Sequence, residues 1–147
     1  AFAAARGRLH VCVFATALAD ITAQLRLPQA APEALVAPAL PGAGGGTDIG
    51  TAVREFTRLH RGRLDPRRSA VLILSDGLDR GEPADLAAAL AGLRRRASTL
   101  AWLNPLAGRA GYEPRARGMQ AALPYLDLLL PADSIASLDA AVRRLGG

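Results

Sequence analysis

The sequence predicts an open α/β fold, in which a doubly wound, mostly parallel sheet carries helices on both faces. Three observations support this fold class. Apolar segments of strand length alternate along the chain with segments that have helical spacing. One of them, residues 69–74 (SAVLIL), is continuously apolar after its first residue, as is typical of a strand covered on both faces. The 147 residues, half of them apolar, suit a single domain with one sizeable core.

The first expected elements are a hairpin and a short helix. Residues 8–16 (RLHVCVFAT) alternate and are rich in β-branched and aromatic residues, which indicates a strand. A tight turn is expected to bring residues 18–24 back as a short antiparallel partner. Residues 32–40 (PEALVAPAL) predict a short helix that Pro38 limits, because proline disrupts a helix interior.

A glycine-dense segment, residues 41–50, leads directly into the next expected helix, TAVREFTRLHRGRL. Within it, Val53, Phe56 and either Leu59 or His60 share a face at helical spacing. Gly62 is expected to end this helix.

The rest of the chain alternates strands with helices. The expected strands are residues 69–74, 99–103 and 127–130, and the expected helices are residues 83–97, 115–125 and 134–145. This alternation predicts parallel pairing through right-handed crossovers. No repeat or linker interrupts the pattern, so residues 1–147 are expected to form one domain.

The start of the chain suggests that this domain is incomplete at its N-terminus. Residues 1–7 (AFAAARG) resemble the middle of a helix without a cap, and Met119 is the only methionine. We find no first strand and no full first helix ahead of residue 8, and expect either an incomplete reading frame or a processed N-terminus.

Composition excludes several classes of function. All 18 basic residues are arginines, set against 13 acidic residues, and they fall in separate clusters without interleaved aromatic residues, so no nucleic-acid partner is expected. The single cysteine, Cys12, offers neither a disulfide nor a zinc-knuckle spacing. The apolar runs are shorter than the roughly 18 residues of a membrane span, and a cytoplasmic protein is expected.

Two loops are candidates for a binding site, because ligands bind beyond the carboxyl ends of the strands in open α/β sheets. In residues 44–50 (GGGTDIG), the glycines allow close approach of a ligand, and Thr47 and Asp48 can cap the following helix. In the second loop, SDG, Asp76 directly follows an apolar strand. Hydroxyl and carboxylate oxygens are ligands that Mg²⁺ prefers.

The residues fit nucleotide binding, phosphatase chemistry and Cys/His catalysis less well. The glycine-rich loop is not a P-loop because the chain has no lysine, and Thr47 replaces the third glycine of a dinucleotide-binding pattern. No second acid stands two residues after Asp76, as an aspartyl phosphatase would require. His10, Cys12 and His60 are interpreted as core or surface residues rather than as a catalytic Cys/His pair.

With GGTDIG, LILSDGLDRG and WLNPLAGRAGYEPRARGMQAALPYLD in this order, the sequence resembles the von Willebrand factor type A (VWA) domains of the CoxE-like bacterial family over essentially its whole length. The resemblance implies a metal-ion-dependent adhesion site (MIDAS). In such a site a D-x-S-x-S loop, a threonine and an aspartate bind Mg²⁺, and an acidic group of a partner protein completes the shell. Thr47 and Asp76 match the threonine and the aspartate. The D-x-S-x-S loop has no counterpart. The resemblance therefore implies that the first central strand and most of the first helix are missing, and Mg²⁺ binding by this chain is expected to be weak or absent.

The resemblance also implies a function. Such a protein would be a non-catalytic accessory module that assists maturation or metal-centre assembly of a larger enzyme, such as carbon monoxide dehydrogenase, beside a MoxR-type AAA+ ATPase. The alternative is a Mg²⁺-dependent phosphate hydrolase that uses Asp76. The expected partner-binding residues are Gly46, Asp48, Ser75, Gly77, Asp79 and Asn104.

Overall fold

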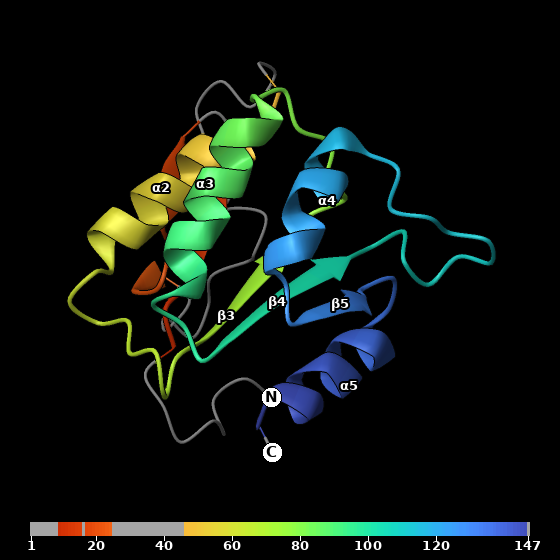
Figure 1. The fold of residues 1–147 in the computed structure, drawn as a ribbon. Coiled ribbons are helices and arrows are strands. Elements are labelled where there is room, and N and C mark those ends of the chain that lie inside the picture. The colour runs from red at the N-terminus through yellow and green to blue at the C-terminus, as the bar shows by residue number, and fades with distance from the viewer. Residues whose placement is uncertain (1–8, 16, 25–45, 147) are drawn as a thin grey trace.

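The computed structural model describes residues 9–15, 17–24 and 46–146, which form two sheets and four α-helices (Figure 1). The strands are β1 (Cys12–Phe14), β2 (Leu18–Asp20), β3 (Ala70–Leu74), β4 (Thr99–Asn104) and β5 (Leu128–Pro131). β1 and β2 form an antiparallel hairpin, whereas β3, β4 and β5 form a parallel sheet in that order. The predicted α/β class and the predicted hairpin are thereby confirmed.

The helices lie on both faces of the parallel sheet, as predicted. They are α2 (Ile49–Leu59), α3 (Pro83–Arg94), α4 (Arg117–Ala122), which continues into the 3₁₀ turn η4 (Leu123–Tyr125), and α5 (Ile135–Gly146). Figure 1 shows α2, α3 and α4 on one face and α5 on the other. The expected helix over residues 32–40 and the helix-like residues 1–7 lie outside the described residues. Nothing among the described helices is long and apolar enough to cross a membrane.

The central strand β4 separates two apolar cores. Its side chains alternate between the faces of the sheet, as the pleat of a strand requires. Leu100 and Trp102 pack into the larger core beneath α2, α3 and α4, whereas Ala101 and Leu103 pack with Ala141 of α5. β4 is therefore the strand that is covered on both faces.

The prediction that residues 69–74 are covered on both faces is wrong. Val71 and Ile73 are buried, but Leu72 and Leu74 on the opposite face are 40% and 54% exposed. The physical reason is the position of β3, which pairs only with β4 among the described strands and so forms an edge of the parallel sheet. The helix on that face, α5, packs on β4 and β5.

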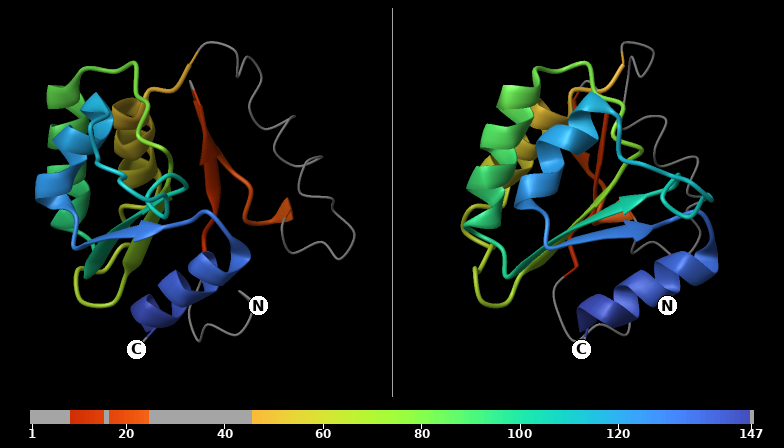
Figure 2. Two further views of the ribbon diagram at one scale, coloured as in Figure 1. Left: turned by 90° about the vertical axis from the view of Figure 1, so that its right-hand side faces the viewer. Right: turned by 45° about the vertical axis from the view of Figure 1, so that its right-hand side comes forward.

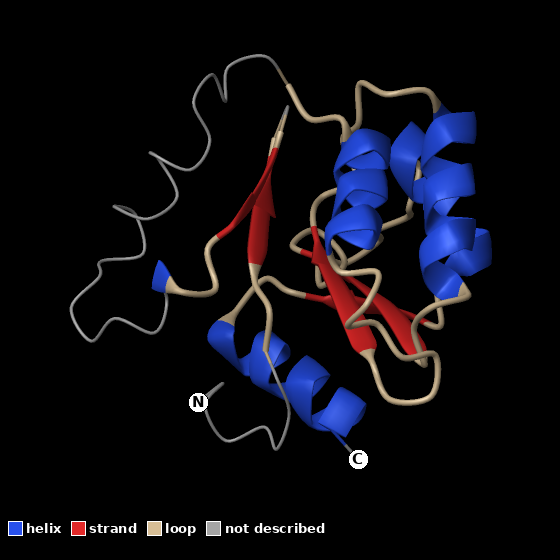
Figure 3. Ribbon diagram, turned by 90° about the vertical axis from the view of Figure 1, so that its left-hand side faces the viewer, coloured by secondary structure: helices blue, strands red, loops and turns tan. Residues whose placement is uncertain are grey.

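The hairpin stands apart from the parallel sheet and lies beside α2 (Figures 2 and 3). Within the described ranges, no strand pairing joins the two sheets. The hairpin is held by Phe14, which packs against the larger core, and by the amide of Asp48, which donates to the carbonyl of Ala15 at 3.1 Å. Both of its strands are shorter than predicted.

Candidate functional site

The loops at the carboxyl edge of β3 and at the start of α2 surround a hollow of about 360 Å³. Both predicted ligands, Thr47 and Asp76, line this hollow although they come from different loops. The other lining residues are Gly46, Leu78, Asp79 and Arg80. The amide of Arg80 donates to the carbonyl of Thr47 at 2.9 Å, so the backbone joins the two loops directly. Gly44 and Gly45 lie outside the described residues.

The turn that carries Asp76 requires a glycine. Asp76 Oδ1 accepts a hydrogen bond from the amide of Leu78 at 2.9 Å, and the amide of Gly77 donates to Ser75 Oγ at 3.1 Å. Gly77 has a φ of +81°, and a β-carbon there would collide with the side chain of Met119. The backbone, rather than a side-chain partner, therefore positions this carboxylate.

Buried side chains of β4 hold the same turn from inside the protein. Trp102 Nε1 donates to the carbonyl of Ser75 at 2.8 Å, and Asn104 Nδ2 donates to the carbonyl of Asp76 at 3.1 Å. Asn104 also donates to the hydroxyl of Tyr112, and both Trp102 and Asn104 are fully buried. Asn104, predicted as a partner-binding residue, thus supports the site from inside the protein and presents no surface to a partner.

Asp48 caps α2, as the sequence predicted. Its Oδ1 accepts from the amide of Thr51 at 2.8 Å, and its Oδ2 accepts from the hydroxyl of the same residue at 2.8 Å. The hydrogen bond from the Thr51 amide is the main reason that the pKa of Asp48 is lowered. Both carboxylate oxygens are therefore engaged at the helix end.

Asp79, predicted as a partner-binding residue, also carries a buried oxygen that the sequence did not predict. Its Oδ1 accepts from the amides of Ile49 at 2.9 Å and Gly81 at 3.2 Å, which links the loop after β3 to the start of α2. Its Oδ2 is buried and has no hydrogen-bond partner in the described part of the chain. The sequence feature that could have pointed to this oxygen is the acidic residue three positions after Asp76 in the segment DGLD.

The hollow thus gathers hard oxygen donors. Thr47 offers a hydroxyl, Asp76 offers a carboxylate, and Asp79 offers a buried Oδ2 that accepts no hydrogen bond in the described part of the chain. These donor types fit Mg²⁺, which prefers oxygen ligands and retains several water molecules. The same hollow is also lined by Arg80, so acidic, hydroxyl and basic side chains meet at this edge of the sheet.

A second polar cluster lies between the hairpin and the end of α2. Sequence reasoning treated His10, Cys12 and His60 as separate residues, but Cys12 Sγ lies 3.5 Å from His60 Nε2. Burial raises the pKa of the Cys12 thiol to about 11, with the charge of Asp20 as the second cause. A thiol with this pKa is protonated at neutral pH and is a poor nucleophile.

A parallel sheet with helices on both faces, and with hydroxyl and carboxylate groups in the loops at its carboxyl edge, is characteristic of an α/β domain of the VWA type. A family model described as VWA domain containing CoxE-like protein matches residues 1–138, and the chain belongs to this family. Comparisons with curated proteins and with solved structures find no match. Membership of the family suggests an accessory module.

Proposed function

We propose that the chain is a non-catalytic, protein-binding accessory module whose Thr47 and Asp76 belong to a MIDAS. The observation that carries the proposal is that these two residues, which come from different loops, line one hollow at the carboxyl edge of the sheet. The proposed client is a larger enzyme of the carbon monoxide dehydrogenase type, whose maturation or metal-centre assembly the module assists together with a MoxR-type AAA+ ATPase.

In this proposal Thr47 and Asp76 hold Mg²⁺, and the buried Oδ2 of Asp79 is a further oxygen near the cation. When bound, the cation supplies a positive charge that attracts an acidic group of the partner protein. Few protein oxygens are available for this task, so binding of Mg²⁺ alone is expected to be weak. The cation and the partner's carboxylate would then bind to the module at the same time.

The hydrogen bonds that hold the loop from inside the protein suit a surface that recognises a partner. Trp102 and Asn104 hold the carbonyls of Ser75 and Asp76 through hydrogen bonds from inside the core. A loop that is ordered before binding loses less conformational entropy when a partner docks. The rigid turn therefore favours recognition of a folded partner by a preformed surface.

The proposal is tested with the substitution Asp76→Ala and a nucleotide-free MoxR-type ATPase from the same organism, so that the ATPase itself needs no Mg²⁺. We expect binding measured by calorimetry to weaken by about tenfold or more, corresponding to about 1.4 kcal/mol. Asp139→Ala, which removes an exposed carboxylate of α5, is the matched control and should bind as the wild type does.

Two outcomes would contradict the proposal. The first is binding that persists unchanged in EDTA and in Asp76→Ala. The second is turnover of phosphate esters that Asp76→Ala abolishes, which would favour the hydrolase alternative. Fluorescence of Trp102, the only tryptophan of the chain, verifies that each variant is folded.

A further inference from the structure

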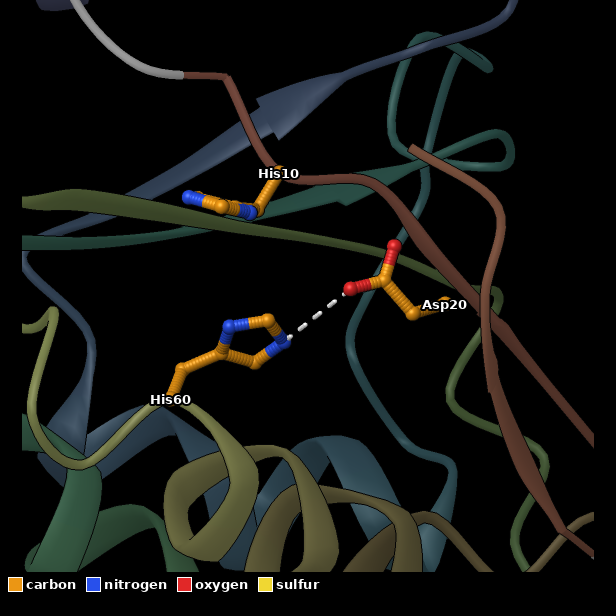
Figure 4. Close-up of side chains that lie close together, drawn as sticks. All are labelled: His10, Asp20 and His60. Atoms are coloured by element: carbon orange, nitrogen blue, oxygen red, sulfur yellow. Dashed lines mark ion pairs between the residues drawn. The ribbon is translucent and has the colours of Figure 1, made fainter. Parts of the chain in front are cut away.

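Both histidines of the chain meet at one place, although they are separated in sequence. His10 precedes β1, His60 caps the C-terminal end of α2, and Asp20 ends β2 (Figure 4). One ligand atom from each of these residues lies within 4.8 Å of the other two. His60 Nε2 is 3.9 Å from Asp20 Oδ2 and 3.5 Å from the sulfur of Cys12, the only cysteine.

We propose that His10, Asp20 and His60, together with the sulfur of Cys12, form a binding site for Zn²⁺ between the hairpin and α2. Two imidazoles, a carboxylate and a thiolate are the ligand types that bind this cation in tetrahedral geometry. Nitrogen and sulfur donors disfavour Mg²⁺ and Ca²⁺, so the site differs in chemistry from the oxygen-lined hollow beside Asp76.

The backbone directs these side chains toward one another. Cys12 and Asp20 are paired across the antiparallel hairpin, so their side chains lie on the same face. His10 is two residues before Cys12, and side chains two residues apart along an extended segment share a face. His60 reaches this face from the end of α2, where its ring lies 5.2 Å from the ring of His10.

The two donor separations that involve His60 Nε2 are close to those of a tetrahedral site. Zn–N bonds of about 2.0 Å and Zn–S bonds of about 2.3 Å at tetrahedral angles separate nitrogen from sulfur by about 3.5 Å. The distance between His60 Nε2 and Cys12 Sγ already has this value. The corresponding separation of nitrogen and oxygen is about 3.4 Å, so Asp20 must approach His60 by about half an ångström.

The cluster is buried on one side and accessible on the other. His60 is 3% exposed, and its Nδ1 has no hydrogen-bond partner among the residues described. Asp20 retains 38% of its side-chain exposure, which gives a cation a route from solvent. On binding, Cys12 releases its thiol proton to solvent and ligates as the thiolate. The bound cation would connect the hairpin to α2.

The test is a calorimetric titration of the metal-free full chain with Zn²⁺ alone. We expect one Zn²⁺ to bind per chain and His10→Gln to weaken binding by about tenfold or more. His10 lies outside β1 and is only half-buried, so this variant is expected to fold. Asp76→Ala, which alters the other proposed cation site, is the control and should bind Zn²⁺ as the wild type does.

Co²⁺ provides a second, spectroscopic measurement on the same protein. The wild type should show the intense visible absorption of tetrahedral Co²⁺ together with a thiolate charge-transfer band, and Cys12→Ser should lose the charge-transfer band alone. The proposal would be overturned by wild-type Zn²⁺ binding that is absent or no stronger than in His10→Gln. It would equally be overturned by a Co²⁺ spectrum without tetrahedral and thiolate bands.

Discussion

At the scale of single residues, buried donors of β4 determine the loop that presents Asp76. The indole of Trp102 and the amide of Asn104 each satisfy a carbonyl of this loop, and both side chains are excluded from solvent. A buried carbonyl that loses its donor carries a penalty of about 1–3 kcal/mol. The conformation of the surface loop is therefore stabilised from inside the protein.

Gly77 gives a prediction at this scale. Gly77→Ala is expected to lower the free energy of unfolding by about 1–3 kcal/mol, because its φ of +81° disfavours a side chain and a β-carbon would collide with Met119. Gly92→Ala in α3 meets open space and should instead stabilise the chain by up to about 1 kcal/mol. Chemical denaturation, monitored by the fluorescence of Trp102, measures the free energy of unfolding of both variants. Changes of the same sign in the two variants would count against this explanation.

At the scale of elements, β3 and β4 differ although both are apolar. β4 lies between two strands and beneath helices on both faces, whereas β3 has one strand partner among the described elements and exposes Leu72 and Leu74. An apolar edge strand offers unpaired backbone groups and apolar surface to another chain. The edge at β3 thus offers an apolar surface for association with another chain.

We predict that the purified chain self-associates at this edge and that Leu74→Lys reduces the association. Charged side chains on an edge strand oppose pairing with a second strand, and Leu74 is exposed enough to be replaced at little cost in stability. Leu59→Lys changes a similarly exposed leucine on α2 and is the matched control. Sedimentation velocity over a range of concentrations provides the measurement. A wild type that stays monomeric, or equal effects of both substitutions, would contradict the prediction.

At the scale of the whole molecule, α2 shares the larger core with the parallel sheet, and the hairpin lies beside α2. Phe14 links the hairpin to the larger core, and His60 lies where the hairpin meets the end of α2. Burial, followed by the charge of His10, lowers the pKa of His60 below its usual 6.5, while Asp20 opposes the shift and Arg63 adds to it. The protonation of one buried imidazole is therefore linked to global stability.

In EDTA, the free energy of unfolding is expected to decrease as the pH falls from 7.5 to 5.5. Because the folded pKa of His60 is lowered, the unfolded chain binds more protons in this range, and the stability present above pH 6.5 is lost as the pH falls toward the folded pKa. His60→Gln should remove this part of the pH dependence. Denaturation curves at several pH values measure the effect, and identical slopes for the two proteins would refute it.

The local pattern of the sequence was sufficient to predict the type and order of the helices and strands in the described segments, the parallel pairing and the two loops that share a hollow. It did not predict the lengths of the hairpin strands. Periodicity and chain order carry this information, because a strand or helix is determined mainly by neighbouring residues and parallel strands place their carboxyl ends at one edge. Thr47 and Asp76 therefore emerged from the sequence, and the family was recognisable from the segments around them.

Only the tertiary structure revealed the exposed face of β3, the unpartnered oxygen of Asp79 and the meeting of His10, Asp20 and His60. An apolar run does not indicate whether it will occupy the centre or the edge of a sheet. The convergence of distant polar residues depends on how the hairpin packs against α2, and no local pattern encodes that packing. The sequence by itself thus determined the class of fold and the two loops that line one hollow, whereas the packing of elements decided which further side chains lie close together.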